Sequence, residues 1–165
     1  MAKAQTKEEA TQTREPALER LNVFSGKWKM QGDQYKTDFG PAAKVTGTQE
    51  YEWLQGNKFL VHRLEGKLGD TDMTCIEIIG HDAAGERFSM DTFYNNGMKQ
   101  KWELHEQHPG TWLISGDWPH KDETVKVHCT ITFADDGKSN SAKWESQKAD
   151  STWETFWDLK AIKTE

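Results

Sequence analysis

The segment that decides the fold is Thr124–Ala134, TVKVHCTITFA, which is followed by the turn sequence Asp135-Asp136-Gly137. Its apolar residues occupy every second position and alternate with lysine, histidine and threonine. A period of two is typical of a strand with one face in a core and one face in solvent, because successive side chains point to opposite sides of a sheet. The pattern places five side chains inside: Val125, Val127, Cys129, Ile131 and Phe133.

Alternating segments of this kind recur about ten times between Phe24 and Ile162, separated by short turns. The turns at Asn95-Asn96-Gly97 and Asp135-Asp136-Gly137 have the residue types of tight β-hairpins. The expected strands are Phe24–Gly32, Ala43–Leu54, Phe59–Leu68, Met73–His81, Arg87–Tyr94, Met98–Glu106, Thr111–Trp118, Thr124–Ala134, Ser139–Gln147 and Thr152–Ile162.

This spacing predicts an all-β protein, an antiparallel up-and-down barrel of about ten strands. Short connections between sequential strands favour a meander, and a meander of this length closes because closure removes unpaired strand edges. A two-sheet sandwich is the main alternative. No segment keeps a 3.6-residue period over the length of a crossover helix, which argues against an α/β fold.

The N-terminal region differs from the rest of the chain in composition. Residues 1–14 are polar and rich in lysine, glutamate, glutamine and threonine, which predicts a disordered tail. Residues 15–21 predict a short helix, with Pro16 in its first turn and Leu18 and Leu21 on one apolar stripe. We expect this helix to plug one end of the barrel, and residues 15–165 to form a single domain.

The predicted interior is unusually aromatic, because most of the eight tryptophans lie in alternating segments. Ten strands make a barrel wider than side chains readily fill, so a cavity is expected, although large rings can also act simply as core filler. In the segments Met73–His81 and Arg87–Tyr94 the pattern leaves the inward face undecided. Elsewhere the residues predicted to point inward include Leu60, His62, Leu64, Trp102, Leu104, Trp112, Ile114, Ala142, Trp144, Trp153, Trp157 and Leu159.

Charge and cysteine content exclude several classes of partner and suggest a compartment. The net charge is −6 and no cluster of basic and aromatic residues is present, so neither nucleic acid nor an anionic membrane is an expected partner. Met1–Ala10 is charged and does not resemble a secretion signal. Cys75 and Cys129 lie far apart in separate strands and are predicted to be buried free thiols, with a disulfide as the alternative; a cytoplasmic location follows.

His62 is the first candidate for chemistry, because it lies on an otherwise aliphatic inward face. An imidazole in such a cavity can anchor a ligand or act as an acid or base, but it can equally be a core histidine bonded to a neighbouring strand. Asp91 and Glu77 are the carboxylates that can pair with it if their strands point them inward; otherwise they face solvent. No metal site is predicted, since His105 and His108 at a hairpin tip supply only two ligands.

Two stretches carry a resemblance to known barrels. Phe24–Trp28, FSGKW, resembles the Gly-x-Trp first strand of lipocalin-like (calycin-type) proteins. Tyr51–Arg63, YEWLQGNKFLVHR, with Ile76–Asp82, IEIIGHD, resembles a bacterial family of unknown function with such a barrel, over residues 20–163. The chain is also distantly similar to fatty-acid-binding barrels and to nitrobindins, whose haem needs a histidine on the last strand. Thr152–Ile162 has none, and no cofactor is expected.

Three functions follow as hypotheses. The first is a barrel that binds a small apolar or aromatic molecule, contacted by Trp53, His62, Leu64, Trp102, Trp112, Ile114 and Trp157. The second is a cofactor-free enzyme, of the isomerase, cyclase or hydratase type, that uses His62 with Asp91 or Glu77. The third is a structural or interaction module, such as a homodimer formed through an exposed strand. A cavity favours the binding barrel, and a hydrogen bond between His62 and a carboxylate open to that cavity favours the enzyme. A filled interior favours the structural or interaction module.

Overall fold

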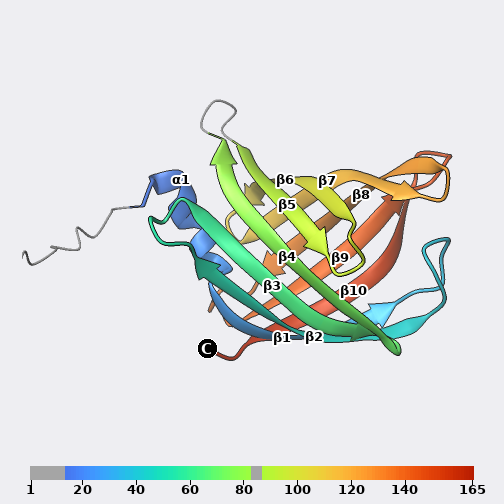
Figure 1. Cartoon of the computed structure of the whole chain (residues 1–165), viewed down its shortest axis with the longest axis horizontal. Helices are drawn as coiled ribbons and strands as arrows, with labels where there is room; N and C mark the ends of the chain where they lie inside the picture. The colour runs from blue at the N-terminus through green and yellow to red at the C-terminus, as the bar shows by residue number, and fades with distance from the viewer. Residues whose placement is uncertain (1–13, 83–86) are drawn as a thin grey trace, which may run out of the picture.

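The computed structural model describes residues 14–82 and 87–165, and these form one closed antiparallel barrel (Figure 1). Each strand pairs with the next along the chain, and the last strand pairs with the first. The strands are β1 (Gly26–Gln34), β2 (Ala43–Trp53), β3 (Phe59–Leu68), β4 (Thr71–Asp82), β5 (Arg87–Tyr94), β6 (Lys99–His108), β7 (Thr111–His120), β8 (Glu123–Phe133), β9 (Ser139–Gln147) and β10 (Trp153–Lys163). The predicted ten-stranded up-and-down barrel is confirmed, and the sandwich alternative is wrong.

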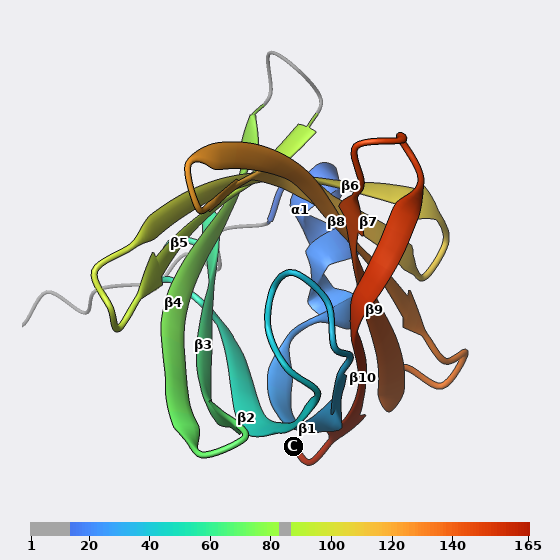
Figure 2. The same ribbon diagram turned by 90° about the vertical axis from the view of Figure 1, so that its right-hand side faces the viewer.

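The helix expected over residues 15–21 is present as α1 (Pro16–Glu19) and the 3₁₀ turn η1 (Arg20–Val23). Leu18 and Leu21 are completely buried, because they project from these turns onto the core. Figures 1 and 2 place α1 at one end of the barrel and the loop between β1 and β2 at the other. The tail predicted at residues 1–14 lies outside the described residues except for Arg14.

The inward faces of β4 and β5, which the sequence pattern left undecided, are clear in the structure. Cys75 and Ile79 are buried on β4, and Phe88 and Met90 are buried on β5. The opposite set on these strands is exposed outside the barrel: Ile76, Ile78 and Phe93. An apolar residue on both faces is the reason why alternation did not reveal the phase of these two strands.

The prediction that Trp153 points inward is wrong. Pairing between β9 and β10 shifts register between Thr155 and Trp157, so that Phe156 is an extra residue on β10. Such a bulge reverses the side of the sheet on which the preceding residues lie. Trp153 is therefore exposed on the outside, where its ring lies 3.9 Å from that of His128, while Trp157 keeps its expected inward position.

A pair of inward glycines allows β2 and β3 to approach closely. Gly47 and Gly66 lie directly opposite each other in the register of these strands. A Cβ atom on Gly47 would lie 2.7 Å from the carbonyl oxygen of Glu65, a distance at which backbone would have to move. Glycine inside a strand commonly marks such a close approach, here on the wall that carries His62.

Closure also bears on association between copies. Within residues 14–82 and 87–165 every strand has a hydrogen-bonded neighbour on each side. No strand there is a free edge strand that could join a second copy by extending the sheet, although the β6–β7 ladder ends at Glu103 and Ser115. The homodimer stays a prediction, and in the described residues its remaining surfaces are outer faces such as that of Ile76, Ile78 and Phe93.

Candidate functional site

The barrel encloses a cavity of about 350 Å³, which lies between the α1 end and the loop connecting β1 and β2. Its walls are mostly aromatic and aliphatic side chains from all around the sheet. A volume of this size with largely apolar walls is typical of small-molecule sites. The tryptophans that line it are Trp28, Trp102, Trp118, Trp144 and Trp157.

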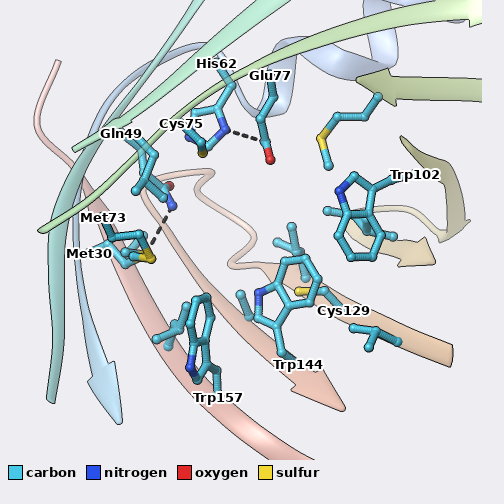
Figure 3. Close-up of a pocket in the computed structure, with 18 of the residues that line it drawn as sticks. Met30, Gln49, His62, Met73, Cys75, Glu77, Trp102, Cys129, Trp144 and Trp157 are labelled. Atoms are coloured by element: carbon cyan, nitrogen blue, oxygen red, sulfur yellow. Dashed lines mark hydrogen bonds and ion pairs between the residues drawn. The ribbon is translucent and has the colours of Figure 1, made fainter. Parts of the chain in front are cut away.

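Five of the seven residues predicted to contact a ligand line this cavity. They are His62, Leu64, Trp102, Ile114 and Trp157. Figure 3 shows His62 on one side and Trp102 and Trp157 across the space from it. Whether these side chains touch a ligand stays a prediction, but their common orientation follows from the alternation that placed them on one face.

Trp53 and Trp112 do not line the cavity, which corrects their predicted placement. Trp53 lies at the end of β2 beside the N-terminal segment, where its indole N–H donates to Asn22 Oδ1 at 2.9 Å and Arg14 lies over its ring at 3.9 Å. Trp112 is fully buried and packs edge-on against Phe24, with 5.3 Å between ring centroids. Both belong to the packed end under α1, which strand periodicity cannot distinguish from the hollow part.

A row of polar side chains crosses four neighbouring strands on the cavity side. Tyr51 lies opposite His62, His62 opposite Glu77, and Glu77 opposite Thr92, as the strand register dictates. His62 Nδ1 is 2.6 Å from Glu77 Oε2, and the Thr92 hydroxyl donates to Glu77 Oε1 at 3.0 Å. The carboxylate acts only as an acceptor, so the contact assigns the Nδ1 proton to His62.

The other ring nitrogen of His62 is buried, and it has no hydrogen-bond partner among the described residues. In the neutral imidazole with a proton on Nδ1, Nε2 is an acceptor. The Tyr51 ring covers one face of the imidazole, nearly parallel to it, with 4.0 Å between centroids. His62 is thus fixed by a carboxylate at one edge and by a ring on one face, and it retains one unused acceptor.

Asp91, the other carboxylate considered as a partner for His62, lies on the wrong side of the sheet. It is exposed and pairs in register with the outward Ile78, one position away from the inward Thr92. A strand cannot present adjacent residues to the same face, so the pairing of His62 with Asp91 is excluded. The predicted pairing with Glu77 is present.

Burial changes the acidity of several groups around the cavity. Desolvation, and next to it the charge of Glu77, raises the pKa of Tyr51 well above its ordinary value. The same two causes raise the pKa of the Cys75 and Cys129 thiols and of Tyr94. Both cysteines are buried and free, as predicted, and the disulfide alternative is not formed. These four groups are therefore neutral at ordinary pH.

The loop of residues 35–42 lies across the end of the barrel opposite α1 (Figure 2). Phe39, at its tip, stacks on Phe156 and His120 with centroid distances of 4.7 and 4.8 Å. Gln34, at the base of the loop, donates to the Pro41 carbonyl at 2.7 Å and accepts from the Trp157 indole at 2.7 Å. All of these residues but Pro41 line the cavity, so the loop forms its cover.

Sequence reasoning missed several residues of this site. Tyr94, Trp118 and Trp144 line the cavity but were not included among the ligand contacts, although strand alternation alone could have added Trp144. Gln34 and Phe39 carried no signal, because one is polar at a strand end and the other lies in a loop. Only the closed structure brings such positions to the cavity.

Metal-ligand clusters and membrane-spanning helices are both absent from the described residues. Within residues 14–82 and 87–165, no group of three or more histidine, cysteine, aspartate or glutamate side chains is placed to bind a metal ion. His105 and His108 do not gain a third ligand there. No helix in these same residues is sufficiently long and apolar to cross a membrane.

The comparison with known proteins agrees with the expectation of a family of unknown function. The model of DUF1579, described as a protein of unknown function, matches residues 13–162, which include the whole of the cavity wall. No curated protein is detectably similar to the chain. Since the match covers nearly the entire barrel, this protein is a member of the DUF1579 family of proteins of unknown function.

Proposed function

We propose that this protein is a lipocalin-like binding barrel that takes up a small, largely apolar or aromatic molecule in its interior. The observation that carries the proposal is the cavity of about 350 Å³, walled by five tryptophans and covered at one end by the 35–42 loop. A filled barrel would bury the same rings against one another and leave no such space. The His62–Glu77 pair supplies the polar end that small-molecule sites commonly contain.

The test uses N-phenylnaphthylamine, an uncharged probe whose fluorescence rises in apolar surroundings. We expect the protein to bind it with saturation at one site. Leu64→Trp places a larger side chain in the cavity, where it occupies volume that the ligand would otherwise fill. We expect this variant to bind the probe about tenfold more weakly or worse. Ile76→Trp, on the outer face of the neighbouring strand, is the matched control and should bind like the unmodified protein.

Equal affinity in the unmodified protein and in Leu64→Trp would contradict an interior site. Native mass spectrometry of the freshly purified protein adds an independent test, because a tightly held natural ligand would appear as added mass that denaturation removes. Circular dichroism and thermal unfolding of both variants establish that any loss of binding arises from the cavity and not from misfolding.

A cofactor-free enzyme is the second candidate, and the Glu77–His62 contact favours it. A base held by a carboxylate, with its other nitrogen free of partners, is the arrangement that general base catalysis uses. The enzyme hypothesis requires that a substrate in the cavity can reach Nε2 of His62. Diethyl pyrocarbonate acylates accessible neutral imidazoles and should then modify His62. Peptide mapping locates the modification, and His62→Gln is the control. Bound N-phenylnaphthylamine should protect His62 from the reagent. Absence of modification at His62 under conditions that label other histidines would contradict this candidate.

A further inference from the structure

Glu77 is the only carboxylate among the described residues that line the cavity. It projects inward from β4 and keeps 14% of its side chain exposed. His62 and Thr92 use one site on each of its oxygens. A carboxylate has about four lone-pair sites, so Glu77 retains capacity to accept donors from a ligand.

The cavity offers this charge no strong cationic partner. Lys160 is the one lysine or arginine among the described lining residues, and it is exposed on β10. His62 contacts one carboxylate oxygen through Nδ1, and among the described residues no lysine or arginine forms an ion pair with Glu77. A charge held in low-dielectric surroundings without a counterion is costly, and a bound cation removes that cost.

The influence of Glu77 extends over much of the interior. After burial, its charge is the second cause of the raised pKa of Tyr51, Cys75, Tyr94 and Cys129. These residues come from four strands, β2, β4, β5 and β8. The cavity is therefore electrostatically suited to a positive ligand.

The facing wall consists of indole rings that suit an apolar or aromatic body. Trp102, Trp144 and Trp157 lie across the cavity from His62 and Glu77 in Figure 3. Trp144 is nearly perpendicular to both neighbours, with centroid distances of 5.4 Å to Trp102 and 6.3 Å to Trp157. Rings set at right angles present both faces and edges to an apolar or aromatic group placed between them.

We propose that the ligand is an organic cation, an amine on an aromatic or aliphatic body, with its ammonium group at Glu77 and its apolar body among Trp102, Trp144 and Trp157. The inference rests on the proposed binding function and specifies its ligand class. An ammonium N–H donates to the open lone-pair sites of Glu77 on the cavity wall. The ring-lined remainder of the cavity excludes water from the apolar body.

The experiment compares three probes of matched shape by isothermal titration calorimetry at neutral pH: naphthylmethylamine, naphthylmethanol and naphthoate. We expect the amine to bind about tenfold more tightly than the alcohol, and the carboxylate to bind least. Glu77→Gln should remove the preference for the amine, so that the amine and the alcohol bind the variant with similar affinity. Asp91→Asn makes the same change of charge on the outside of the adjacent strand and should preserve the preference.

The outcomes separate the two proposals. If the alcohol binds as tightly as the amine in the unmodified protein, the cationic ligand is overturned and the apolar binding barrel stands. If none of the probes binds, the binding function fails and this inference fails with it. The ranking in the unmodified protein does not depend on any variant, so it decides the matter even if Glu77→Gln does not fold.

Discussion

Tyr51 illustrates how strongly this interior alters an ordinary side chain. Desolvation, and after it the charge of Glu77, raises its pKa well above the usual value, so the folded protein favours the neutral phenol. An unfolded tyrosine ionises near a pKa of about 10. The resulting stabilisation is therefore complete below about pH 10 and is lost as the pH rises above it, where only the unfolded chain releases the proton.

We predict that Tyr51→Phe makes stability less sensitive to alkali. Between pH 9 and pH 11, the unfolding free energy of the unmodified protein should fall by about 1.4 kcal/mol more than that of the variant, the contribution of one proton released on unfolding. Urea denaturation at both pH values measures this difference. The two proteins compared at pH 9 give the change in unfolding free energy that comes from removing the hydroxyl itself, before any ionisation. Parallel changes in the two proteins would show that Tyr51 ionises freely in the fold.

His62 and Glu77 differ in how far the sequence alone reveals them. His62 could be predicted because it lies on the same face of β3 as the leucines, which are all an even number of positions away from it along that strand. Glu77 stayed undecided because isoleucines occupy both faces of β4, and its partner depends on the register that sets it opposite His62. Asp91 was an equal candidate until the phase of β5 was known. Register is a property of strand pairing, which residue types within one strand do not specify.

The loop of residues 35–42 is the element whose role could not be predicted. It has no periodicity, and its contact with β10 through Phe39 and Phe156 joins positions more than a hundred residues apart. The bulge at Phe156 was missed for a similar reason, because a register shift arises from the neighbouring strand. By contrast, strands such as β8 were predicted within one residue at either end from alternation alone.

We predict that Phe39→Ala accelerates exchange of an interior ligand. The ring stacks on Phe156 and His120, and loss of two such contacts should lower the barrier to opening enough to raise the dissociation rate of N-phenylnaphthylamine about tenfold. Stopped-flow fluorescence measures the rate. Tyr35→Ala, which removes an exposed ring from the same loop, should leave it unchanged. If both variants release the probe at the rate of the unmodified protein, the loop is not the route of passage.

The molecule as a whole divides into a packed end and a hollow end. Beneath α1, Leu18, Leu21 and Trp112 are buried without contact to the cavity, whereas Leu64 lines it. A core that is filled at one end stabilises the barrel, while the other end keeps space for a ligand. Strand number and alternation predicted that a cavity could exist, but its position depends on where the helix docks.

This division predicts unequal costs for the same truncation. Leu21→Ala should lower the unfolding free energy by about 2–5 kcal/mol, because it opens a void in packed surroundings. Leu64→Ala only enlarges an existing space and should cost about 1–2 kcal/mol, close to the transfer free energy of the lost methyl groups. Urea unfolding of both variants gives the comparison. Equal losses would contradict a hollow end.

The seam between β1 and β10 has a consequence for synthesis. Trp28 pairs with Lys163, so the ring of hydrogen bonds cannot close until the final strand has left the ribosome. Pairings over such sequence separation make folding slow, since most of the chain has to be ordered before they form. Until β10 is available, the aromatic side chains that β1 contributes to the interior therefore lack the neighbouring strand that covers them in the closed barrel.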